Sequence, residues 1–275
     1  RSEDLYVEAD GKRISLAGDW KYRIGLSLTG FPPAPISPVQ SSSYPTVLFN
    51  AMVKPWTAFP IKGVIWYQGE ANVGRSEQYG DLFPALITDW RRQWRSDFPF
   101  YFVQLANFME SKKIQPDSEW AALREAQTKA LKLDQVGMVV TIDIGLADDI
   151  HPKNKQEVGR RLALVALAGS YGKNVSSSAP VFQNYIIKGN KMELDFGQKQ
   201  DGFQIKGTTL KGFTIAGPDR VFYPAEAMVH DGKIILSSTE VPAPLAARYG
   251  WADNPDCNLY GENGLPVAPF RTDCW

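Results

Sequence analysis

Gly63-Val64-Ile65-Trp66-Tyr67-Gln68-Gly69-Glu70-Ala71-Asn72 is the stretch that decides the fold of this chain. Its first half completes a short apolar run over residues 61–67, which predicts a buried strand. Its second half is polar and contains a glycine, which predicts a turn. In a parallel sheet, ligands bind at the carboxyl ends of the strands. The stretch therefore predicts one strand of such a sheet, with its chemistry in the turn that follows.

The segments after this stretch alternate between a helical and a strand pattern. Apolar residues recur at helical spacing over residues 76–95, 118–132 and 153–170. Apolar runs between them predict further strands over residues 100–105 and 136–144. Strands and helices in alternation predict an α/β fold in which helices cover a parallel sheet.

Residues 1–60 are predicted to form an irregular N-terminal region. Asp10-Gly11 is the turn signal of a β-hairpin, and the proline-rich stretch after it cannot hold a helix. The central region then supplies only three predicted strands, whereas open sheets usually have about 4–6. Either residues 1–60 supply the others, or more sequence lies upstream.

The C-terminal part changes to a β pattern. Turn signals such as Asp231-Gly232 separate four strand-like segments, which predicts a small antiparallel region. These segments are residues 181–187, 192–196, 213–216 and 233–236. The last stretch, residues 251–275, is predicted to be an ordered surface loop. The predicted domains are residues 1–60, 61–175 and 176–275.

The composition excludes some classes of function. Lys+Arg and Asp+Glu both number 30, and this balance gives no support to nucleic-acid or anionic-membrane binding. The sequence has no apolar run of about 18 residues that would span a membrane. The two cysteines, Cys257 and Cys274, match no zinc pattern, and the sequence leaves open whether they form a disulfide or stay free.

Two histidines, His151 and His230, are the candidates for acid/base chemistry. His230 precedes a hairpin turn, where a solvated residue is expected. His151 follows the third strand and precedes a helix, at the predicted catalytic edge of the sheet. A general base also needs an acceptor that fixes its tautomer. Asp148, three residues earlier, is the predicted acceptor, and Asp149 and Asp143 are its rivals.

The turn after the first strand suits the binding of an oxyanion. Gly69 permits a tight turn with close backbone approach, while Gln68 and Asn72 carry amide donors. Glu70 is predicted to orient a neighbour or to contact substrate. Arg124, on the second predicted helix, is a candidate for a substrate carboxylate, although a surface arginine is the simpler interpretation.

A glycosidase with paired carboxylates is the alternative chemistry. Glu70 with Asp143, Asp148 or Asp149 supplies a possible pair of acids. That mechanism has no use for His151. An ester hydrolase, in which His151 is the general base and the turn after the first strand binds the oxyanion, therefore ranks above it.

These segments together resemble the sialate O-acetylesterases of the SGNH hydrolase superfamily. The resemblance covers nearly the whole chain. It is carried by residues 63–72, 77–94, 98–108, 120–131, 143–164 and 248–255, and most specifically by Ile150-His151-Pro152-Lys153-Asn154-Lys155-Gln156-Glu157-Val158-Gly159-Arg160.

The resemblance implies a flavodoxin-like, three-layer α/β fold with added β structure. It implies removal of acetyl groups from sialic acids or other acetylated glycans through an acyl-enzyme, with no metal or cofactor. By position, His151 matches the catalytic histidine and Gln68-Gly69-Glu70 the oxyanion block. Some relatives lack an acid at the position of Asp148, and there backbone carbonyls or another acid orient the ring. A periplasmic or secreted bacterial location is expected.

The nucleophile segment of the family is missing from this sequence. Relatives carry the serine in a Gly-Gln-Ser-Asn-type segment upstream of residues 1–20, and here the nearest string is Gly25-Leu26-Ser27. We therefore expect a truncated chain, or one partnered by a companion polypeptide with the serine, and expect this chain alone to be inactive. The alternative is a non-catalytic glycan-binding or structural fragment.

Overall fold

The computed structural model describes residues 6–15, 19, 44–197 and 202–275. The chain divides into two compact units, residues 1–51 and residues 52–275. We describe each unit by itself.

In the first unit, β1 (Tyr6–Ala9) and β2 (Lys12–Ser15) form an antiparallel hairpin. Asp10 and Gly11 connect them with φ of 51° and 69°. These are the positive values that a two-residue hairpin turn requires at both central positions. The predicted hairpin is therefore confirmed, whereas Gly25-Leu26-Ser27 lies outside the described residues.

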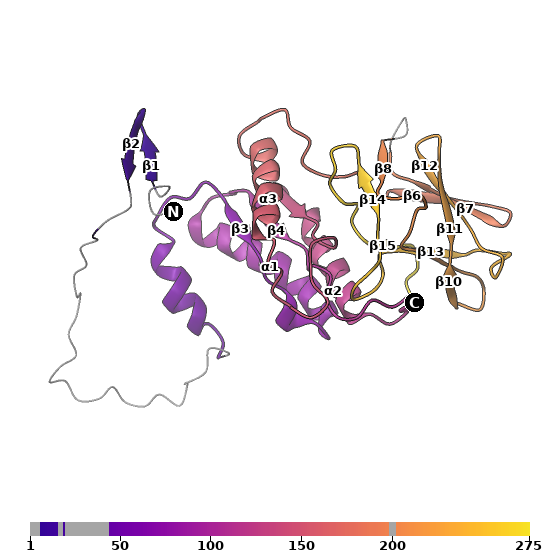
Figure 1. Cartoon of the computed structure of the whole chain (residues 1–275). Coiled ribbons are helices and arrows are strands. Elements are labelled where there is room, and N and C mark those ends of the chain that lie inside the picture. The colour runs from indigo at the N-terminus through magenta and orange to yellow at the C-terminus, as the bar shows by residue number, and fades with distance from the viewer. Residues whose placement is uncertain (1–5, 16–18, 20–43, 198–201) are drawn as a thin grey trace. The chain divides into compact units, whose positions relative to one another are not determined.

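The second unit begins with alternating strands and helices (Figure 1). The strands β3 (Val64–Trp66), β4 (Phe100–Val103) and β5 (Val136–Val139) pair in parallel in the order β3-β4-β5. The helices are α1 (Ser76–Trp94), α2 (Glu119–Thr128) and α3 (Lys155–Gly169). The helical turns are η2 (Phe49–Val53, which spans the division between the units), η3 (Lys54–Trp56), η4 (Glu70–Asn72) and η5 (Lys129–Lys132). The predicted parallel α/β core is confirmed.

The helices cover both faces of this sheet. Phe100 and Phe102 on β4 belong to one buried cluster, which also contains residues of α1 and α2. Tyr101, between them in sequence, packs with Val165 of α3 in a separate cluster. Successive side chains of a strand point to opposite faces. Therefore α1 and α2 lie on one face and α3 on the other, which is the three-layer arrangement expected.

The rest of this unit is antiparallel (Figure 1). Its sheets have the orders β10-β9-β13-β15, β11-β12-β7-β6 and β14-β8. The strands are β6 (Asn184–Lys188), β7 (Lys191–Asp195), β8 (Phe203–Ile205), β9 (Phe213–Ala216), β10 (Phe222–Pro224), β11 (Glu226–His230), β12 (Lys233–Ser237), β13 (Ala246–Tyr249), β14 (Leu259–Gly261) and β15 (Phe270–Arg271). The predicted antiparallel region is confirmed, and it contains more strands than the pattern indicated.

The prediction of a surface loop for residues 251–275 is wrong. Leu259 and Val267 in this tail are each 1% exposed and belong to the main core cluster of the antiparallel region. The tail also contains β14 and β15. Its many Asn, Asp, Gly and Pro residues reflect turns between short buried segments.

Arg124 on α2 is fully buried, so its interpretation as a surface arginine is also wrong. Its guanidinium donates to four backbone carbonyls, those of Leu105, Ala106, Ala252 and Asp253, at 2.7–2.8 Å. Burial lowers the pKa of Arg124 to about 9, which still leaves it protonated at neutral pH. Arg124 therefore fastens the C-terminal tail to the α/β core.

Cys257 and Cys274 are both free thiols in this structure. Within the described part of the chain, no helix is both long enough and apolar enough to cross a membrane.

Candidate active site

His151 lies in the loop between β5 and α3, with 88% of its side chain exposed. Its backbone N–H donates to Asp149 Oδ1 at 2.9 Å, and its ring Nδ1 lies 3.8 Å from the same oxygen. Asp149, a rival in the sequence prediction, is thus the carboxylate beside the imidazole. The ring is open to solvent and free to meet a substrate.

Asp148, the predicted orienting acid, is exposed. Among the residues that the structure describes, its side chain makes no hydrogen bond or ion pair. Its catalytic role stays a prediction, with Asp149 closer to the ring in this structure.

The turn after β3 is built around the side chain of Gln68. Its amide Nε2 donates to Asn72 Oδ1 at 2.7 Å, and its Oε1 accepts from the Tyr79 hydroxyl at 3.2 Å. An amide nitrogen carries two N–H groups. Asn72 thus orients Gln68 and leaves the second N–H of that amide available to a ligand.

Gly69, the next residue of this turn, is buried. A Cβ at this position would lie 3.1 Å from both Gln127 Nε2 and Leu105 Cδ2. Such contacts are tighter than ordinary van der Waals packing, so a side chain here would require Gln127 and Leu105 to shift by a few tenths of an ångström. The close backbone approach predicted for Gly69 has this physical basis.

Gln127 on α2 is a positioning residue that the sequence prediction missed. It is fully buried and bridges two strand ends, because its Nε2 donates to Gln68 O at 3.3 Å and its Oε1 accepts from Leu105 N at 2.9 Å. Its position on the same helical face as Trp120 and Leu123 was the available signal, since a glutamine on an apolar stripe must find buried partners.

A cavity of about 310 Å³ brings the two predicted segments together. Its walls come from the turn after β3 and from the loop before α3. They are formed by Tyr67, Gln68, Glu70, Ala71, Ile150, His151, Pro152 and Lys155. Three of the predicted residues, Gln68, Glu70 and His151, therefore share one cavity. Gly69 and Asn72 belong to the same turn but are not among the residues that line the cavity. The chemical roles of all five residues stay predictions.

Tyr67 and Lys155 add polar groups to this cavity that sequence reasoning did not single out. The Lys155 ammonium lies 4.7 Å from the centre of the Tyr67 ring. The Tyr67 hydroxyl is a buried atom with no hydrogen-bond partner among the described residues. Burial, and next the charge of Glu70, raises the pKa of Tyr67 to about 12, so the phenol stays protonated.

Asp143 is engaged elsewhere, which weakens the alternative of paired carboxylates. Both of its oxygens accept from Arg161, at 2.7 and 2.8 Å, and one also accepts from the Tyr260 hydroxyl at 3.3 Å. His230 lies at the end of β11, 3.4 Å from Asp231 and mostly exposed, as expected for a solvated residue beside a turn.

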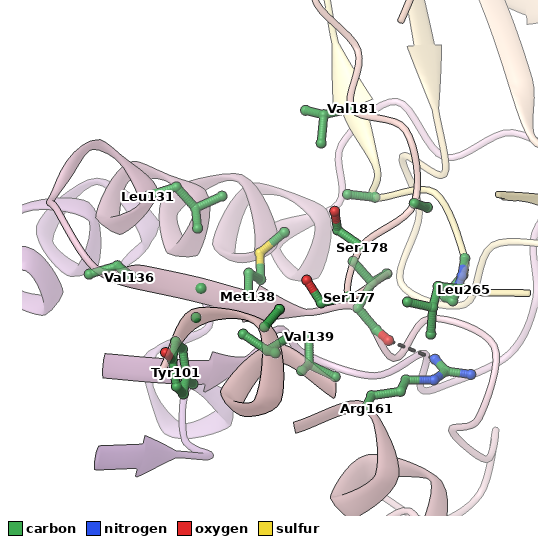
Figure 2. Close-up of a pocket in the computed structure, with 18 of the residues that line it drawn as sticks. Tyr101, Leu131, Val136, Met138, Val139, Arg161, Ser177, Ser178, Val181 and Leu265 are labelled. Carbon is green, nitrogen blue, oxygen red and sulfur yellow. Dashed lines mark hydrogen bonds between the residues drawn. The ribbon is translucent and has the colours of Figure 1, made fainter. Parts of the chain in front are cut away.

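A larger cavity, of about 540 Å³, lies along β5 and α3 (Figure 2). Its walls are mostly apolar, with Met138, Val139 and Leu265 among them. Arg161, its one charged residue, is already bonded to Val140 O, Asp143 and Glu157. The larger cavity therefore lacks acid/base groups, and the smaller one at His151 is the candidate active site.

The sheet is parallel and is covered by helices on both faces. The cavity beyond its strands is lined by the imidazole of His151 and by the turn that contains Gly69. These features define the class of protein. This is an α/β protein with a candidate ligand site at the carboxyl edge of its sheet. Residues 34–168 match the family model of the carbohydrate esterases described as sialic acid-specific acetylesterases. The chain belongs to the sialate O-acetylesterase family.

Two relatives and one solved structure illustrate the similarity. The chain is 31% identical to the sialate O-acetylesterase of Homo sapiens over 91% of its own length and 54% of that protein. It is 32% identical to that of Mus musculus, over 82% and 47%. A carbohydrate acetylesterase from Xanthomonas citri matches with a TM-score of 0.80 and 46% identity, over 84% of this chain and 55% of that one. The chain thus spans about half the length of the relatives it matches.

Proposed function

We propose that this chain carries the acid/base and oxyanion-binding parts of an esterase site that removes O-acetyl groups from sialic acids. The observation that carries the proposal is the single cavity formed by His151, Gln68 and Glu70. The sialate O-acetylesterases among the relatives support the reaction and the substrate class.

The proposed chemistry is acyl transfer in two steps. A serine oxygen attacks the acetyl carbonyl while His151 takes the hydroxyl proton, and His151 then returns a proton to the sugar oxygen that leaves. Water next attacks the acyl-enzyme with His151 as base and releases acetate. The second N–H of the Gln68 amide is the donor for the oxyanion or for the sugar.

Of the two oppositely charged side chains at the cavity, Glu70 and Lys155, the lysine suits an anionic sugar. Lys155 is an exposed ammonium beside Tyr67, and sialic acid carries a carboxylate that a neutral acetylated sugar lacks. A charge-assisted hydrogen bond contributes about 1.5–3 kcal/mol. Lys155 is therefore the proposed contact of the sialate carboxylate.

The nucleophile is proposed to come from a segment outside these 275 residues. Within the described residues, β3 pairs only with β4, and Ile65 at its centre is 67% exposed. An unpaired apolar edge of this kind accepts another strand. The comparisons give no support to a separate companion polypeptide, and a periplasmic or secreted location stays a prediction.

The test is hydrolysis of a chromogenic acetyl ester and of O-acetylated sialic acid. It compares the 275-residue chain with a form preceded by a Gly-Gln-Ser-Asn segment from a relative. We expect turnover only in the longer form, and its loss in His151→Ala but not in the matched control His230→Ala. If the longer form binds O-acetylated sialic acid without any turnover, the chain is a glycan-binding module and the proposal is wrong.

A further inference from the structure

The loop that leads to His151 is held in place by the loop that follows β4. Gly145 N donates to Asn107 Oδ1 at 2.6 Å, and Met109 N donates to Ala147 O at 3.1 Å. These two bonds lie close before His151 in the chain. They therefore fix the path by which the loop reaches the active-site cavity.

Gly145 packs so closely against Asn107 that no side chain fits at residue 145. A Cβ at residue 145 would lie 1.9 Å from the Asn107 carbonyl oxygen and 2.6 Å from its Oδ1. Real Cβ atoms do not approach so closely, so the two backbones are in direct contact at this point. A shift of Asn107 must therefore be transmitted to the histidine loop.

Asn107 is in turn held by the C-terminal tail. Its Nδ2 donates to Asn254 Oδ1 at 2.8 Å, and Asn254 Nδ2 donates to Met109 O at 2.7 Å. The two residues before Asn254 are fixed by Arg124, through the carbonyls of Ala252 and Asp253. A continuous series of hydrogen bonds thus runs from the buried Arg124 to the loop of His151.

From this series we infer that Asn107 and Asn254 are positioning residues for His151. The C-terminal antiparallel region then contributes to catalysis, because it sets the position of the His151 imidazole through Asn254. Only the catalytic consequence of this inference rests on the proposed function. The positioning itself is a property of the loop and is measurable without turnover.

The experiment compares two nearly isosteric replacements of Asn107. Asn107→Asp keeps an oxygen that accepts from Gly145 N but loses the Nδ2 group that donates to Asn254, whereas Asn107→Leu removes both groups. Asn263→Leu is the matched control, since Asn263 likewise accepts from a backbone N–H, that of Leu265, and donates to the carbonyl of Ser178, and within the described residues it bonds to none of residues 145–151. Asn254→Leu removes the second member of the series and serves the same purpose if Asn107→Leu does not fold.

The first readout is the NMR signal of the imidazole Cε1–H group. The chain has two histidines, so His230→Gln assigns both signals. We expect Asn107→Leu and Asn254→Leu to shift or broaden the His151 signal and to leave that of His230 unchanged. Asn107→Asp, which keeps only the bond to Gly145, should shift the His151 signal less than Asn107→Leu does, and Asn263→Leu should leave both signals in place. An unchanged His151 signal in both leucine variants of the series overturns the inference, and so does an equal shift in Asn263→Leu.

The second readout is catalysis by the longer form that carries the serine. Loss of a residue that orients a catalytic group lowers activity about 10–100-fold. We expect this loss in kcat for Asn107→Leu, with KM nearly unchanged and with a smaller loss in Asn107→Asp. An inactive wild type would defeat the proposed function alone, because the NMR comparison still decides the positioning.

Discussion

Asp149 Oδ1 accepts the backbone N–H of His151 at 2.9 Å and also lies 3.8 Å from the Nδ1 atom of the same residue. One carboxylate oxygen thus holds the backbone of the histidine and faces its ring. The ring distance exceeds a hydrogen bond, and catalytic hydrogen bonds are often long before substrate binds. A small rotation of the exposed imidazole would complete the bond.

This geometry predicts that Asp149, rather than Asp148, orients the imidazole. In the longer form with the serine, Asp149→Asn should lower kcat by about tenfold or more, while Asp148→Asn should change it by less than about twofold. Steady-state kinetics on a chromogenic acetyl ester measures both. The reverse ranking would restore Asp148 to the role that its spacing indicated.

Lys155 is predicted to select an anionic sugar. Loss of a charge-assisted hydrogen bond in Lys155→Gln should raise KM for O-acetylated sialic acid about tenfold, with little change in kcat. KM for acetylated xylose should stay the same, since xylose has no carboxylate. An equal rise for both sugars would show that Lys155 does not discriminate by charge.

Arg124 is predicted to be essential for stability. Arg124→Met leaves four buried carbonyls without their donor and should lower the free energy of unfolding by about 3 kcal/mol or more. Arg92→Met is the control, because the Arg92 side chain is 77% exposed and, among the residues that the structure describes, forms its ion pair with Asp89 alone. Its effect in urea unfolding should stay within about 0.5 kcal/mol.

Glu157 on α3 should make the stability depend on acid. Hydrogen bonds, first from Arg160 and also from Arg161, lower the pKa of Glu157 from 4.5 to about 2. The folded state therefore favours the carboxylate, and this contribution is present above the unfolded pKa and is lost as the pH falls through the folded one. The Tm of the wild type should approach that of Glu157→Gln between pH 4.5 and about 2. A constant difference across this range would contradict the prediction.

The two thiols should differ in reactivity. Burial raises the pKa of Cys257 to about 12, whereas Cys274 is exposed. Alkylation requires the thiolate, so at about pH 8 one thiol of the native chain should react quickly. Mass spectrometry should locate the label on Cys274, and Cys274→Ser should abolish rapid labelling. Fast labelling of Cys257 in that variant would show that the thiol is not shielded.

The sequence predicted the alternation of strands and helices well. The reason is that periods of two and of 3.6 residues are local properties, visible wherever one face of an element is buried. The residues of the candidate site were also predictable, since Gln68 and His151 follow strands whose carboxyl ends meet at one edge. The segments after β3 and before α3 do share a cavity.

The sequence pattern was wrong where long-range contacts outweigh local composition. The tail after Trp251 has the composition of a loop, yet much of it is buried because β14 and β15 pair with strands distant in sequence. Arg124 was predicted to lie at the surface, because nothing local reveals that four carbonyls from two separate segments converge on it.

The sequence by itself therefore determined the parallel α/β core, and it predicted the edge at which Gln68 and His151 share a cavity, since these depend on local periodicity and on the geometry of parallel sheets. Only the tertiary structure decided that Asp149 faces His151, that Gln127 supports Gln68 and that Asn254 reaches Asn107. Each of these is a contact of a few ångströms, and except in the His151 loop it joins residues far apart in the chain. Such contacts are fixed by packing and not by any pattern along the sequence.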